Sequence, residues 1–80
     1  MMYGVSSVFN FRKWNHSVYT FDDEKTAQKW LNTEEYNFSE RELMDESKAI
    51  KLAGKKAVKN AVKVTMKKDE NGIEYIEKEC

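Results

Sequence analysis

The chain contains a single cysteine, Cys80, which is the last of its 80 residues. No internal disulfide can form, and one histidine with one cysteine cannot supply the four ligands of a structural zinc site. A chain of this length has room for one hydrophobic core. The sequence therefore predicts a single domain, residues 1–80, that is held together by packing or by self-association.

Strand-type patterns fill the amino-terminal part of the chain. Residues 2–11 alternate apolar and polar side chains, and residues 17–21 are β-branched or aromatic. The mostly polar segment 12–16 between them predicts a turn, so the two strands are expected to form a hairpin. The alternation places Phe9 and Phe11 on the buried face of the first strand.

A second pair of strands is expected near the carboxyl terminus. Residues 62–66 alternate valine and methionine with polar side chains, and residues 73–77 continue as a strand. The segment 69–72 between them reads Asp-Glu-Asn-Gly, which is typical of a tight turn.

Helices are expected between the two hairpins. Asp22 and Asp23 can cap a first helix, in which Ala27, Trp30 and Leu31 form an apolar stripe.

A capping box predicts the start of a second helix. Ser39 and Glu42 have the spacing of this motif, so we expect the helix to begin at Glu40. The helix could continue to Val62 or break near Ser47, which would cap the second piece. We favour the break.

The resulting element order is β-β-α-α-(α)-β-β. Strands at both ends with helices between them predict a small α+β domain, with an antiparallel sheet covered by helices on one face.

Charge is segmental although the net charge is zero. Residues 1–21 carry +2, 22–46 carry −6, 47–68 carry +8 and 69–80 carry −4. No signal peptide and no apolar run of membrane-spanning length is recognisable, so we expect a cytoplasmic protein that does not contact membranes.

No motif for catalysis, metal binding or cofactor binding is recognisable. The carboxylates of Asp22, Asp23 and Glu24 are typical of a helix cap, and His16 has no nucleophile in a known arrangement. We therefore expect no enzymatic activity, no metal site and no cofactor.

The segment 48–63 predicts a helix with a lysine face opposite a face of small side chains. Such a face could follow the phosphates of a nucleic acid, or it could be a solvated surface, and the absence of arginine argues against sequence-specific readout. The candidate nucleic-acid-binding residues are Lys48, Lys51, Lys55, Lys56, Lys59 and Lys63.

A second set of residues is a candidate for binding a protein partner. Trp14 lies among polar residues and is either folded onto the core or exposed as an anchor. The acidic segment 22–46 could imitate a nucleic-acid backbone, or it could be a solvated face. The candidate partner-binding residues are Trp14, His16, Asp22, Asp23, Glu34 and Glu35.

Segments between Val18 and Ala61 resemble small uncharacterised proteins of phages and conjugative elements of Gram-positive bacteria. The similar segments are Tyr19-Thr20-Phe21-Asp22, Lys29-Trp30-Leu31 and Lys51-Leu52-Ala53-Gly54-Lys55-Lys56-Ala57. The resemblance implies an accessory protein of a mobile element, a group that includes DNA-binding regulators and inhibitors of host defence such as anti-CRISPR proteins. It assigns a role to no residue.

The sequence thus favours a non-enzymatic module that acts by protein–protein interaction, as an inhibitor of a host nucleic-acid-handling complex. The alternative is a nucleic-acid-binding accessory protein that uses the lysine helix. The charge pattern would also allow two copies to pair, acidic segment against basic helix, as a homodimer.

Overall fold

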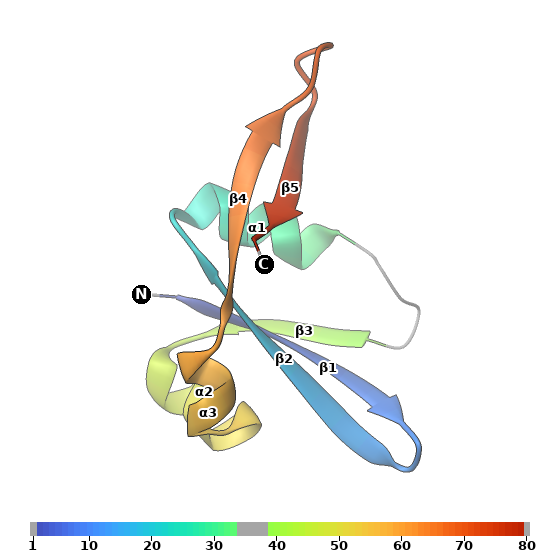
Figure 1. Ribbon diagram of the computed structural model, residues 1–80, viewed down its shortest axis with the longest axis vertical. Helices are drawn as coiled ribbons and strands as arrows, with labels where there is room; N and C mark the ends of the chain where they lie inside the picture. Colours follow the sequence, from blue (N-terminus) through green and yellow to red (C-terminus); the bar gives the residue numbers. More distant parts are fainter. Residues whose placement is uncertain (1, 34–38, 80) are drawn as a thin grey trace.

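The amino-terminal part of the chain forms a long antiparallel hairpin (Figure 1). The computed structural model describes residues 2–33 and 39–79. Strand β1 (Tyr3–Asn10) pairs with β2 (Lys13–Phe21) over its whole length, from Tyr3 opposite Thr20 to Asn10 opposite Lys13. The predicted hairpin is confirmed, but the predicted turn over 12–16 is wrong, because the connection consists of only two residues.

The predicted helix from Glu40 is also wrong, because Ser39–Met44 forms strand β3. This strand pairs antiparallel with β1, from Val8 opposite Ser39 to Tyr3 opposite Met44. Leu43 and Met44 point to opposite faces of the sheet and contact different parts of the core. Burial on both faces suits a strand, so tertiary packing overrides the local capping signal.

Helix α1 (Glu24–Asn32) follows β2, and a broken helix follows β3. Helix α2 (Glu46–Ala53) is capped by Asp45, whose carboxylate accepts a hydrogen bond from the Lys48 amide at 2.9 Å. A helix therefore does start near Ser47, as predicted, but Asp45 caps it in place of Ser47, and it is interrupted at Gly54, where φ is +97°. The short helix α3 (Lys55–Lys59) follows this glycine.

Strands β4 (Val62–Lys68) and β5 (Glu74–Lys78) form the predicted second hairpin. The sheet order is β3-β1-β2-β4-β5, and β4 joins β2 in parallel through three residue pairs, from Tyr19 opposite Val62 to Phe21 opposite Val64. The predicted α+β class is confirmed, but the sheet is mixed and not wholly antiparallel. The two hairpins project in different directions from its centre (Figure 1).

Helices cover both faces of the sheet, which corrects the expectation of one covered face. On one face, α2 and α3 pack Ala49 and Val58 onto Tyr3, Val5 and neighbouring side chains. The other face carries α1, whose Ala27 and Trp30 pack against Phe21 and Val64. Because successive strand residues alternate between faces, Tyr3 and Gly4 contact different helices.

The fully buried Trp30 indole lies against Gly4 in β1. Its ring centroid is 5.4 Å from those of both Tyr19 and Phe21, and the guanidinium of Arg41 lies 5.0 Å from the ring. The same guanidinium donates hydrogen bonds to the carbonyl groups of Trp30, at 2.6 Å, and Thr33. Arg41 therefore joins β3 to the negative end of the α1 dipole.

Replacing Gly4 with alanine should destabilise the protein by about 1–3 kcal/mol through overpacking. A Cβ at this position would lie 2.7 Å from Trp30 Cζ3 and 2.9 Å from Phe21 Cζ, so the helix and the sheet would have to move apart. Chemical denaturation measures the effect. Ser6→Ala, on the same face of the same strand, is the control, and equal unfolding free energies for both variants would contradict this account.

Candidate functional site

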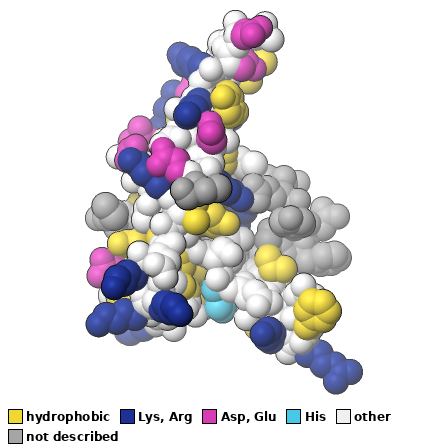
Figure 2. Space-filling view, in the orientation of Figure 1, with side chains coloured by type: hydrophobic (Ala, Val, Ile, Leu, Met, Phe, Trp, Pro, Cys, Tyr) yellow, Lys and Arg dark blue, Asp and Glu magenta, His cyan; other side chains and the backbone are white. Residues whose placement is uncertain are grey.

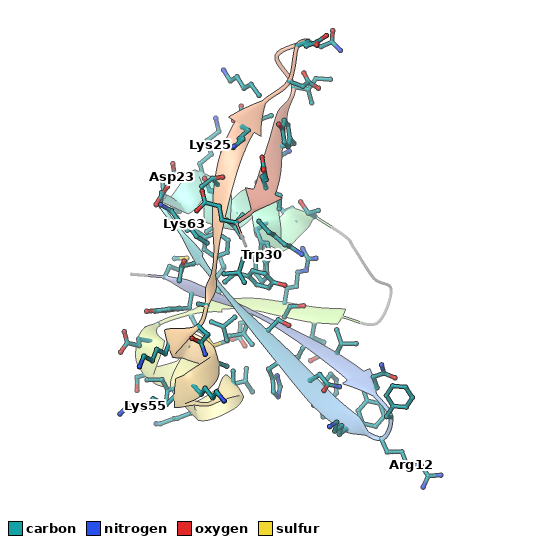
Figure 3. All side chains as sticks on the ribbon, viewed as in Figure 1. Arg12, Asp23, Lys25, Trp30, Lys55 and Lys63 are labelled. Atoms are coloured by element: carbon teal, nitrogen blue, oxygen red, sulfur yellow. The ribbon has the colours of Figure 1, made fainter. Side chains whose placement is uncertain are left out.

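The end of the β1–β2 hairpin extends beyond the helices that cover the rest of the sheet (Figures 1 and 3). Phe9 is 54% exposed, Phe11 87% and Trp14 48%. We call the five residues that surround this end, Phe9, Phe11, Arg12, Lys13 and Trp14, the hairpin tip. Large apolar side chains are normally buried, so a group of three exposed aromatics on one element is informative.

The aromatic side chains of the tip are held in place by the strand pairing. Phe9 and Trp14 are direct cross-strand partners, and their ring centroids lie 5.4 Å apart with the ring planes tilted by 57°. Such pairs stabilise a hairpin by roughly 0.5–1 kcal/mol. The pair therefore gives the exposed surface a defined shape.

The turn has an unfavourable backbone conformation for its sequence. Phe11 has φ of +51° and Arg12 has φ of +65°. A two-residue turn of the primed type needs positive φ at both positions, which is why Asn-Gly is its usual sequence. Left-handed backbone costs roughly 1–2 kcal/mol for a residue with a Cβ. Strained residues of this kind concentrate at functional sites.

An open groove of about 460 Å³ adjoins the tip, on the sheet face that carries α2. Trp14, His16 and Leu52 contribute to its walls, together with Val5, Ser7, Glu40, Arg41 and Glu42. The groove thus combines aromatic, aliphatic and charged side chains from three neighbouring strands and one helix.

Within the groove, the Ser7 hydroxyl and His16 Nδ1 are 2.7 Å apart. Ser7 is buried in β1, which has a strand on each side. Because the backbone N–H groups around Ser7 point into these two ladders, they are not available as an oxyanion hole. We interpret the bond as a contact that orients the imidazole of His16.

The predicted acidic residues do not join Trp14 and His16. Asp23 caps α1 by accepting a hydrogen bond from the Thr26 amide at 2.7 Å, and Asp22 pairs with Lys63 at 3.2 Å. Both lie at the opposite end of β2 from the tip, about 26 Å from Trp14 at the usual rise of a strand (Figure 3). Glu34 and Glu35 lie outside the described residues.

The lysine residues of the predicted helix have different environments. Lys48 pairs with Glu42 at 2.6 Å, and this hydrogen bond raises the lysine pKa, with the charge of Glu42 adding to the effect. Lys63 lies on β4 and pairs with Asp22. In the described part of the chain, the remaining four are exposed and make no ion pair; they are Lys51, Lys55, Lys56 and Lys59.

The break at Gly54 prevents these lysines from forming one straight helical row, because α3 has only five residues. Lysine and arginine side chains nevertheless gather over α2–α3 and at the hairpin tip, with the histidine between the two groups (Figure 2). Around the β4–β5 hairpin, at the other end of the molecule, acidic and lysine side chains lie side by side (Figure 2).

Of the five tip residues, the sequence predicted only Trp14 as a binding residue. The alternation predicted that Phe9 and Phe11 share one strand face with Tyr3 and Val5, and it gave no sign that they are exposed. Alternation does not show where the covering helices end. No local signal marks the two-residue turn, because Phe11 and Arg12 are unusual residues at positive φ.

Comparison of the chain with protein-family models, curated proteins and solved structures gives no match in any of the three. No helix of residues 2–33 and 39–79 is long and apolar enough to cross a membrane. The same residues contain no group of histidine, cysteine and acidic side chains that could hold a metal ion. The tip, the groove and the charges around them are therefore the features of the structure that bear on its function.

Asp23→Ala should lower the melting temperature most strongly near neutral pH. Hydrogen bonds from Thr26 lower the pKa of Asp23 below its ordinary value of 3.8, so its stabilising effect is present above that value and disappears as the pH falls through the lowered pKa. Thermal melts from pH 7 to pH 2 should show the two proteins converging in acid.

Asp22→Ala is the matched control for this series. Asp22 makes only an exposed ion pair, so its removal should have little effect at any pH. A constant difference between wild type and Asp23→Ala across the pH range would show that the capping carboxylate is not responsible.

Proposed function

We propose that this protein is a non-enzymatic binding module that contacts a partner protein through the hairpin tip. The observation that carries the proposal is the exposure of Phe9, Phe11 and Trp14 on one hairpin, where Phe9 and Trp14 pack against each other. Tryptophan, tyrosine and arginine supply most binding energy at protein interfaces, where they fill pockets on the partner. Trp14, flanked by the two phenylalanines and by Arg12, fits this pattern.

The strained turn gives independent support. A sequence selected only for stability would place Asn-Gly at positions 11 and 12. Phe11 and Arg12 are less favourable there, yet they place an aromatic ring and a guanidinium at the furthest point of the hairpin. Retention of unfavourable residues at this position is expected if both side chains contact a partner.

We further propose that the partner belongs to a nucleic-acid-handling complex of a host cell and that binding inhibits it. This part rests on the resemblance to proteins of mobile elements. Imitation of a nucleic-acid backbone by the acidic segment receives less support, because Asp23 acts as a helix cap and Asp22 pairs with Lys63. The tip is therefore a better candidate contact than the acidic residues.

The double substitution Phe11→Asn with Arg12→Gly should separate binding from stability. Asn-Gly suits positive φ at both positions, so the variant should be more stable than wild type by roughly 1–2 kcal/mol. It should nevertheless lose partner binding, because the outermost ring and the guanidinium are gone. Denaturation measures the first effect, and affinity capture from host extract with quantitative mass spectrometry measures the second.

Ile73→Asn is the matched control for the capture experiment. Ile73 is an exposed apolar residue beside the turn of the other hairpin, so its loss should leave the captured partner unchanged. Capture of the same proteins in equal amounts by wild type and by the Asn-Gly variant would refute the proposed role of the tip.

The second candidate function is binding of a nucleic acid by α2 and α3. It is favoured by the four exposed lysines without an ion pair in the described part of the chain, Lys51, Lys55, Lys56 and Lys59. Against it, the net charge of the chain is zero, so the molecule as a whole does not attract a polyanion.

If the four lysines contact phosphates, the slope of log K against log salt should be near −3.6 for duplex DNA. Replacing Lys51, Lys55 and Lys59 with glutamine should flatten this slope and weaken binding to all sequences alike. Fluorescence anisotropy at several salt concentrations measures both. Tight binding at 150 mM salt, with Kd below about 1 μM, would favour this candidate over a protein partner.

A further inference from the structure

Strand β2 has a free edge along residues 13–17. Its partner β4 joins it only at Tyr19, Thr20 and Phe21 and then runs away from the hairpin (Figure 1). Residues 13–17 have β1 on one side. On their other side there is no strand among the described residues. The sheet is therefore incomplete beside the hairpin tip.

The backbone groups of this edge point outward at alternate residues. A two-residue turn is closed by a hydrogen-bonded pair, here Asn10 and Lys13, so Lys13 and Asn15 direct their backbone groups to β1. Trp14 and His16 then direct their N–H and C=O groups away from the sheet. In the described part of the chain, the backbone N–H groups of these two residues make no backbone hydrogen bond outside the strand ladder.

This edge lacks the charged side chains that protect the other edges. The outer strand β3 carries Glu40, Arg41 and Glu42, and the outer strand β5 carries Glu74, Glu77 and Lys78. Charged residues on an edge discourage pairing with another chain. Between Lys13 and Ser17, only Lys13 carries such a charge, and Trp14 is exposed. The β2 edge is thus the most receptive to an added strand.

The sheet face beside this edge carries side chains that an added strand could contact. Trp14 and His16 form the β2 side of the groove, and β1 and β3 lie beyond them. An added strand would lie on the other side of β2 from β1, so its alternate side chains on this face would pack against Trp14 and His16. Peptides that extend a sheet gain affinity from backbone hydrogen bonds and specificity from side-chain contacts of this kind.

Charges around the edge define the chemistry of the occupant. Arg12 and Lys13 lie at one end of the segment, and the lysines of α3, a helix that contacts β2, lie towards the other (Figures 2 and 3). The acids of the groove are on β3, two strands away, where Glu42 is paired with Lys48. A second copy that paired its own β2 edge here would bring two sets of lysines together.

We infer that the free edge of β2 binds an extended, acidic segment of the partner protein, which adds to the sheet as a further antiparallel or parallel strand. This inference rests on the protein-binding function proposed above and names the class of partner segment. The hairpin tip and the edge form one continuous surface, since Trp14 belongs to both.

Hydrogen exchange on the wild-type protein tests the inference without any substitution. The probes are two synthetic twelve-residue peptides, one alternating glutamate with valine and threonine, the other with lysine in place of glutamate. The glutamate peptide should protect the amides of Trp14 and His16, which exchange freely in the unbound protein. Binding of the lysine peptide should be at least tenfold weaker, measured by amide chemical shifts.

A pair of substitutions at one position tests the backbone contact. His16→Pro removes an outward N–H at an edge position where proline is tolerated, whereas His16→Ala removes the same imidazole and keeps the N–H. The proline variant should bind the glutamate peptide about tenfold more weakly than the alanine variant. If the melting curve shows that either variant is misfolded, the hydrogen-exchange data on the wild-type protein alone decide whether the edge binds the peptide.

Three outcomes would overturn the inference. The first is no protection of Trp14 and His16 by the glutamate peptide at millimolar concentration. The second is equal binding of the two peptides. The third is protection of these amides in the protein alone as its concentration rises, which would identify a second copy as the occupant.

The proposed function would fail separately. If the Asn-Gly turn variant captures the partner as well as wild type does, the role of the tip is refuted whatever the edge does. If the captured partner is lost in the turn variant but retained by His16→Pro, the tip binds the partner and the edge does not.

Discussion

The contact between Trp30 and Gly4 is the constraint on which the rest of the structure depends. An indole can lie this close to a β-strand only where the strand has no side chain, and a Cβ at Gly4 would lie 2.7 Å from it. The contact fixes α1 on one face of the sheet. Arg41 then joins α1 to β3 through the carbonyl groups of Trp30 and Thr33, so β3 is held beside β1. That face is thereby occupied, and α2 and α3 pack on the opposite one.

The position of the helices decides which part of the hairpin is available for binding. They cover Tyr3, Val5 and Val18, but the strands continue beyond them to Asn10 and Lys13. Two of the aromatics on this extension, Phe9 and Trp14, pack against each other. In the described part of the chain, the same extension leaves residues 13–17 of β2 without a second neighbouring strand. The exposed aromatics and the free edge therefore both result from the extension of the β1–β2 hairpin beyond the helices.

Several errors of sequence reasoning have a common physical origin. Ser39 has the local sequence of a helix cap, but the segment that follows it pairs with the free edge of β1. As a strand, this segment can bury Leu43 and Met44 on opposite faces of the sheet. The turn was missed because Phe11 and Arg12 are unusual at positive φ. The sequence predicted that the lysines lie on one helix, whereas Gly54 ends α2 and divides the lysines between two helices. In each case long-range contacts or a special backbone conformation outweighed a local pattern.

The sequence by itself determined the α+β class, both hairpins, the first helix with an aspartate cap at 22 or 23, and the segmental charge, because periodicity, capping and charge are local properties of the chain. It also singled out Trp14. Only the tertiary structure decided that β3 is a strand, that helices cover both faces, that Asp22 and Asp23 lie far from Trp14, and that the hairpin tip and the β2 edge are uncovered. Exposure depends on where other elements end, and that depends on contacts between residues distant in the chain, such as Trp30 with Gly4.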